Sequence, residues 1–212
     1  KPEDGRTYER VYIGGDYGQQ NATTYQAFGL DTYRQKFPGL DEYYHSGRES
    51  GIQRSPSEYA KDLVTFIDEL HETYETKVFY ICLDPSAKGL QEEIKRATRT
   101  GLDYQVLIRD AENDVALGIS RVQKLFVFDV LSISPKQENL IRELGIYEYD
   151  KKSIEKGKEV PIKENDHGCD ALRYACMTAW KHIKRWLPTA PLEEKEYIVD
   201  IARKDMGEDG YF

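Results

Sequence analysis

Hydrophobic and polar positions divide the first 83 residues into short strands, one amphipathic helix and a further strand. Residues 10–16, 22–28 and about 40–45 carry β-branched and aromatic side chains separated by turn residues, which predicts an antiparallel meander. Ser55 and Pro56 then supply a capping hydroxyl and a first-turn proline. Apolar side chains follow at intervals of three and four, which predicts one buried helix face: Tyr59, Leu63, Phe66, Ile67, Leu70 and Tyr74. Residues 78–83 are continuously apolar, as in a central strand covered on both faces.

The rest of the chain alternates between helix and strand patterns. We expect helices at 87–100 and 113–123, and strands at 104–108 and 125–128. A capping pattern at 134–137 predicts a helix that ends near Gly145, followed by a hairpin over 147–162 and a long helix over about 166–186. This order predicts an α/β fold of the RNase H-like type, in which an antiparallel three-strand meander precedes parallel strands and helices flank the mixed sheet.

Length and composition limit the possibilities. The 212 residues predict a single domain, 1–212, with a core at about 8–186 and a peripheral acidic tail at 187–212. The chain begins with Lys1 and lacks an apolar leader, so we expect a piece of a longer protein. No apolar run is long enough to cross a membrane. The three cysteines form no CxxC pair, which favours free thiols in a reducing cytoplasm.

Three separated aspartates are the candidate chemistry. Asp16 and Asp84 each follow a strongly apolar strand, and strand ends are where α/β folds place ligand groups. Asp170 lies in the first turn of the last helix, three residues from His167, so the two side chains can share a face. Carboxylates brought together resist ionisation unless a cation neutralises them, and imidazole is a possible metal ligand or proton carrier. Each residue also has a structural explanation: a turn at Asp16, a cap at Asp84, favourable dipole placement at Asp170 and a solvent-facing ring at His167.

The net charge of −8 argues against nucleic acid as a partner, although metal ions at an acidic site reverse the local sign. Basic residues gather in two places that could contact DNA: Lys88, Lys95 and Arg99 on one helix, and Lys151, Lys152, Lys156 and Lys158 near the expected hairpin. Glutamates are interleaved in both groups, so a solvated, salt-bridged surface is the alternative.

Three motifs in fixed order carry a family resemblance. They are IGGDYG at 13–18, ICLDPS at 81–86 and NDHGCDALRY at 165–174, joined by YYHSGRE at 43–49. Over about residues 8–186 the chain resembles the C-terminal nuclease domain of the large terminase subunit of tailed bacteriophages. The resemblance implies an RNase H-like endonuclease that cuts concatemeric double-stranded viral DNA when packaging begins and ends.

The resemblance also implies site and partners. Asp16, Asp84 and Asp170 would form a metal-binding triad with His167 as auxiliary ligand, and two Mg²⁺ or Mn²⁺ ions would drive hydrolysis. Partners would be double-stranded DNA, the ATPase domain upstream in the full-length chain, the small terminase subunit and the portal protein, in the cytoplasm of the infected bacterium. The family's motor is a separate ATPase domain, and no GxxxxGK[ST] loop occurs here.

Two other classes compete with the nuclease. Residues 16–24 also resemble the first phosphate loop of the actin and sugar-kinase superfold, which shares this strand order but needs a second loop and lobe. A non-catalytic domain that docks DNA or the portal, with aspartates kept for structure, is the other alternative. Measured ATP binding would favour the first, and an empty triad at millimolar Mn²⁺ would favour the second.

Overall fold

A six-stranded mixed sheet forms the centre of the molecule. The computed structural model describes residues 5–18, 21–155, 157 and 160–188. The sheet has the order β5-β4-β1-β2-β3-β6. Its strands are β1 (Arg10–Asp16), β2 (Ala22–Leu30), β3 (Phe37–Ser46), β4 (Val78–Leu83), β5 (Leu107–Asp110) and β6 (Leu131–Ser132). The first three pair antiparallel, whereas β4 joins β1, β5 joins β4 and β6 joins β3 in parallel, which confirms the predicted mixed sheet.

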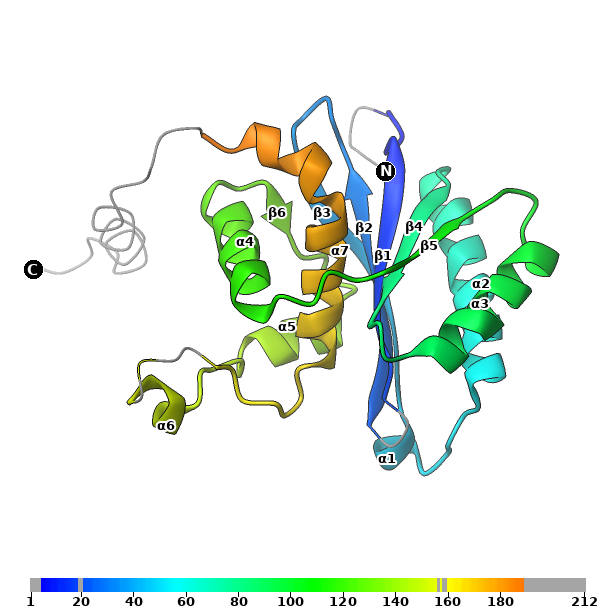
Figure 1. Cartoon of the computed structure of the whole chain (residues 1–212). Helices are drawn as coiled ribbons and strands as arrows, with labels where there is room; N and C mark the ends of the chain where they lie inside the picture. Colours follow the sequence, from blue (N-terminus) through cyan, green and yellow to red (C-terminus); the bar gives the residue numbers. More distant parts are fainter. Residues whose placement is uncertain (1–4, 19–20, 156, 158–159, 189–212) are drawn as a thin grey trace, which may run out of the picture.

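Helices cover both faces of this sheet (Figure 1). One face packs against α2 (Pro56–Tyr74) and α3 (Lys88–Gly101). The other face packs against α7 (His167–Ile183), with α4 (Val115–Val127) and α5 (Glu138–Leu144) beside it. The described residues also form three short helical turns: α1 (Gly47–Ser50), α6 (Lys151–Ile154) and η1 (Lys184–Trp186). No helix in the described ranges has the length and apolar character needed to cross a bilayer.

Local chemistry explains the main helices. Ser55 and Glu58 form a reciprocal capping box at the start of α2, and its predicted apolar face is buried against the sheet. Helix α7 is buried on most of its surface because it lies directly on β1 and β2. At Gly14 the two backbones come so close that a Cβ atom would overlap the carbonyl oxygen of Ala171. This contact places the first turn of α7 beside the carboxyl end of β1.

Two predictions in the second half are wrong. Residues 125–128 are not a strand but the last turn of α4 and its C-cap; Val122 and Leu125 continue its buried face, and the strand follows at β6. A short apolar run does not distinguish these two possibilities by itself. In the described part of 147–162, Tyr149 and Pro161 form an antiparallel bridge, but α6 begins directly after it and no hairpin strands are formed there. The Asp150 carboxylate accepts from the Lys152 N–H and so starts that helical turn.

Smaller boundary shifts follow from capping and pairing. Strand β5 begins at Leu107 rather than 104, because its pairing with β4 starts at Tyr80. Residues 134–137 form a turn, closed by the Gln137 N–H on the Ser134 carbonyl, and α5 begins only at Glu138. The last helix ends at Ile183 and continues to Trp186 as a 3₁₀ turn. The described cysteines are free thiols and are buried.

Candidate active site

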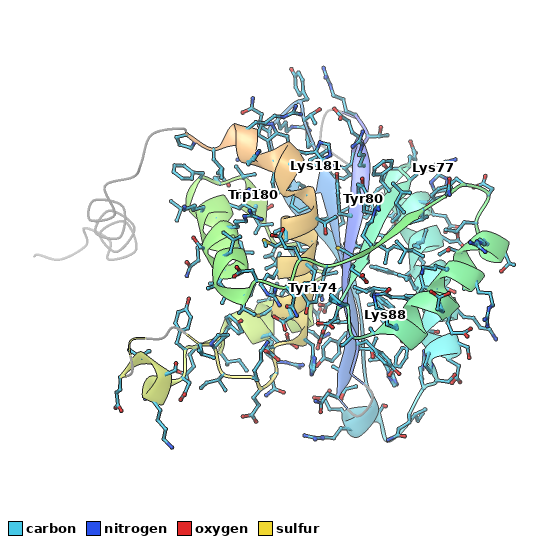
Figure 2. All side chains as sticks on the ribbon, viewed as in Figure 1. Lys77, Tyr80, Lys88, Tyr174, Trp180 and Lys181 are labelled. Carbon is cyan, nitrogen blue, oxygen red and sulfur yellow. The ribbon has the colours of Figure 1, made fainter. Side chains whose placement is uncertain are left out.

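The three predicted aspartates come from elements that meet at one edge of the sheet, the edge formed by the carboxyl ends of β1 and β4. Asp16 ends β1 and Asp84 directly follows β4; these strands run parallel, with Gly15 opposite Leu83. Asp170 lies in the first turn of α7, which packs on β1. Tyr174 lies among them: burial raises the pKa of its hydroxyl, and the charge of Asp170, the hydrogen bond to Asp84 and the charge of Asp16 raise it further. Figure 2 shows Tyr174 between α7 and the sheet, with Trp180 and Lys181 toward the other end of that helix.

Asp16 and His167 form a direct pair. The His167 Nδ1 atom lies 2.7 Å from Asp16 Oδ2, and both side chains are largely buried. Burial raises the pKa of Asp16, and the charges of Asp170 and Asp166 add to the rise while His167 opposes it. The hydrogen bond from Asp16 raises the pKa of His167 against the effect of burial. The carboxylates therefore concentrate negative charge around Asp16 and His167, and this stabilises a positive charge between them.

Asp84 is held in its ionised form. Its Oδ1 accepts from the Ser86 N–H at 2.6 Å, and its Oδ2 accepts from the Tyr174 hydroxyl at 2.9 Å and the Asn113 amide at 3.4 Å. Burial alone would raise the pKa of Asp84, but the hydrogen bonds from Ser86 and Tyr174 and the charge of Arg173 bring it below the usual value. A carboxylate that is ionised, oriented and partly open to solvent is suited to bind a cation.

Asp170 is enclosed by two cations that the sequence analysis did not identify. Its Oδ1 accepts from Arg173 at 2.9 and 3.2 Å, and its Oδ2 lies 2.9 Å from the Lys163 ammonium. Lys163 also contacts Asp166 Oδ2 at 3.1 Å. The spacing of three residues on one helix could have indicated Arg173. No sequence pattern could have indicated Lys163, because it lies before the helix and its contact with Asp170 depends on how the chain folds there.

Glu143 caps the N-terminus of α7. Its side chain is buried, and Oε2 accepts from the N–H groups of Gly168 at 2.5 Å and Cys169 at 3.3 Å. Asp166, at the N-cap position, provides no side-chain cap of its own, so Glu143 satisfies these helix N–H groups instead. Burial raises the pKa of Glu143 to about 7 despite these hydrogen bonds. In the sequence this residue is only one polar position of an amphipathic helix.

The residues fit a divalent cation by their chemistry. Carboxylate oxygens are the ligands that Mg²⁺ and Mn²⁺ prefer, and the buried Asp166 carboxylate has only the half-exposed Lys163 ammonium, 3.1 Å from its Oδ2 atom, as an ion-pair partner. Within the part of the chain that the structure describes, no three acidic, imidazole or thiol groups are arranged as a ready metal site. Cations and hydroxyls of the protein satisfy the carboxylates instead. Binding an ion would require these partners to move.

The predicted DNA-contacting residues lie in separate places. On α3, Lys88 pairs with Asp110 at 2.9 Å and Lys95 pairs with Glu92 at 2.6 Å, as the salt-bridged alternative expects. Arg99 lies in the last turn of the same helix. Lys151 and Lys152 are exposed on α6. Lys156 and Lys158 lie outside the described residues.

The fold and the acidic sheet edge together define an RNase H-like domain. A family model described as "Terminase RNAseH like domain" matches residues 16–177. The chain therefore belongs to the terminase RNase H-like domain family. No curated protein sequence gave a significant match.

Solved structures agree with this assignment. The large terminase of a thermophilic bacteriophage is 31% identical over 80% of this chain, with a TM-score of 0.69. The chain spans 39% of that terminase. The P22 large terminase nuclease domain has a TM-score of 0.63 at 16% identity, covering 85% of this chain and 86% of that one. The nuclease domain of the bacteriophage SPP1 large terminase, solved with bound Mn, has a TM-score of 0.53 at 20% identity, covering 80% and 86%. The last two show a shared fold.

Proposed function

We propose that this chain is the endonuclease domain of a large terminase subunit and hydrolyses double-stranded concatemeric viral DNA in a metal-dependent reaction. The observation that carries the proposal is the meeting of Asp16, Asp84 and Asp170 at one sheet edge in a chain of the terminase family. The manganese in the SPP1 nuclease domain supports the choice of Mg²⁺ or Mn²⁺ as cofactor.

The candidate residues would have different roles in binding the metal ions. Asp16, from the central strand, is the candidate to bridge two ions, with Asp84 on one side and Asp170 with His167 on the other. Bound ions would activate water, orient the scissile phosphate and stabilise the leaving 3′ oxygen. The Tyr174 hydroxyl holds Asp84 in place. The imidazole of His167 lies against Asp16, with Nδ1 2.7 Å from Asp16 Oδ2, where it would hold that carboxylate in position.

The net charge of −8 suggests that the isolated domain binds DNA weakly and cuts with little sequence preference. Site choice would then come from the rest of the packaging assembly: the ATPase domain of the full-length subunit, the small terminase subunit and the portal, in the cytoplasm of the infected cell. The exposed Lys151 and Lys152 on α6 are candidate DNA contacts. The α3 cations Lys88, Lys95 and Arg99 are secondary candidates.

A non-catalytic docking domain is the second candidate function. The observation that favours it is that groups of the protein already occupy the carboxylates: His167 contacts Asp16, and the cations Lys163 and Arg173 pair with Asp170. A purely structural acidic cluster would have this form. The phosphate-loop interpretation of residues 16–24 gains no support, since the family match assigns the chain elsewhere.

Plasmid cleavage tests the proposed function. Supercoiled DNA is incubated with Mg²⁺, Mn²⁺ or chelator, using wild type, Asp84→Asn and a matched control, Asp41→Asn. Asp41 lies on β3, forms an ion pair with Lys136 and is not one of the candidate ligands. We expect metal-dependent nicking that Asp84→Asn lowers by at least about 100-fold and the control leaves intact. A folded Asp84→Asn chain that nicks at the wild-type rate would remove Asp84 from the mechanism, and no nicking by wild type would favour docking.

A further inference from the structure

Lys163 lies over the acidic site from the solvent side. Its ammonium is 2.9 Å from Asp170 Oδ2 and 3.1 Å from Asp166 Oδ2. The lysine side chain is 56% exposed, whereas the two carboxylates are 11% and 9% exposed. The buried partners are therefore fixed, and the lysine is the member of the cluster that can leave.

Arg173 holds the other side of Asp170 and differs in this respect. Its guanidinium is buried, donates twice to Asp170 Oδ1 and also donates to Asn113 Oδ1 at 3.1 Å. Its partners and burial keep it in place. Asp170 Oδ2 is consequently the oxygen that Asp170 can offer to a metal ion, and Lys163 occupies it in this structure.

We propose that Lys163 is the resident counter-cation of this site and that a divalent metal ion must displace its ammonium from Asp170 and Asp166 in order to bind. The inference rests on the proposed function, since it assumes that Asp170 is a metal ligand. An ammonium and a divalent ion on one carboxylate oxygen compete for its negative charge, because the two positive charges repel each other. Binding of the metal and release of Lys163 are then a single exchange.

The released side chain has a place to go. A polar hollow of about 320 Å³ lies beside the site, and Lys163 is part of its lining. Glu49 and Glu164 line the same hollow, together with the cation Arg48. An ammonium that leaves the buried pair can therefore remain near negative charge while staying in solvent.

Mn²⁺ binding measures the competition without relying on activity. Electron paramagnetic resonance of free Mn²⁺ gives the dissociation constant for wild type, Lys163→Met, Lys163→Arg and a control, Lys136→Met. The control removes a lysine of similar exposure, 52%, from an ion pair of 2.8 Å with Asp41. We expect Lys163→Met to bind Mn²⁺ on the order of tenfold more tightly, because two partly buried ion pairs no longer compete. Lys163→Arg, which keeps the competing charge, and Lys136→Met should stay close to wild type.

Thermal unfolding provides the second measurement. Without metal, Lys163→Met should unfold at a lower temperature than wild type, because Asp166 and Asp170 lose their counter-charge, and added Mn²⁺ should raise its midpoint more than that of wild type. If Lys163→Met does not fold, Lys163→Gln replaces it in both measurements.

The outcomes separate the two proposals. Equal or weaker Mn²⁺ binding by Lys163→Met, with wild type still binding metal and nicking DNA, overturns the role of Lys163 and leaves the nuclease intact. An equal gain in Lys136→Met would show a general charge effect and also overturn it. Binding of Mn²⁺ by none of the chains would overturn both proposals.

Discussion

Gly14→Ala tests how the fold positions the site. Gly14 lies in β1, two residues before Asp16, where α7 crosses the strand. A Cβ there would overlap the Ala171 carbonyl oxygen and lie 2.8 Å from the Ala171 carbonyl carbon and 3.0 Å from the Ala175 nitrogen. These are backbone atoms of a buried helix, so no side-chain rotation relieves the contact. The helix must shift away from β1.

The expected cost follows from this geometry. Overpacking a core typically costs about 1–3 kcal/mol, and rigid backbone neighbours place Gly14→Ala at the upper end. For a domain of this size that lowers the unfolding midpoint by about 6–12 °C. The nicking rate of the folded variant should also fall, because Asp170 moves with α7. A displacement of about 1 Å can lower a rate by roughly 100-fold.

Circular dichroism melting and plasmid nicking, the latter at a temperature where the variant is fully folded, measure the two effects. The control is Gly89→Ala on α3, where a Cβ meets nothing within 4 Å and helix propensity predicts a gain of up to about 1 kcal/mol. Gly14→Ala with the melting midpoint and nicking rate of wild type would refute the claim that close β1–α7 packing sets the site geometry.

Three further predictions concern single groups. Because the folded-state pKa of Glu143 is raised to about 7 from 4.5, its contribution to stability is complete below about pH 4.5 and is lost as pH rises through 7. The free energy of unfolding of Glu143→Gln should therefore rise relative to wild type between pH 5 and 8, by on the order of 3 kcal/mol, and a flat difference in denaturant titrations would contradict this. His167→Ala should reduce nicking less than the aspartate substitutions and change the preference between Mg²⁺ and Mn²⁺; an unchanged preference would exclude His167 as a ligand. Charge reversal of both Lys151 and Lys152 should weaken DNA binding and reduce its salt slope by roughly 2, and an unchanged slope would remove α6 from the interface.

Local patterns predicted the framework of the fold. The apolar strands at β1 and β4 and the capping box and stripe of α2 depend on neighbouring residues only, so the sequence alone located them. The same strands indicated Asp16 and Asp84 as groups at one sheet edge. The prediction for residues 125–128 failed because an apolar run fits either a buried strand or the face of a helix, and packing of α4 against α7 decides between them.

The partners of the candidate ligands could not be predicted in the same way. Glu143 reaches the N–H groups of α7 across 25 positions of the chain, and Lys163 reaches Asp170 from a segment without helix or strand pattern. Neither contact follows from spacing, because both depend on how separate elements pack. Arg173 is the intermediate case, since its helical spacing from Asp170 is visible but its burial is not.

Anomalous scattering from crystals soaked in millimolar Mn²⁺ tests the central claim most directly. The account predicts manganese peaks among the carboxylates of Asp16, Asp84 and Asp170, with the Lys163 ammonium moved away from Asp170 and the peak beside Asp84 lost in Asp84→Asn. Well-ordered crystals with no manganese at this sheet edge, and with Lys163 still on Asp170, would contradict it.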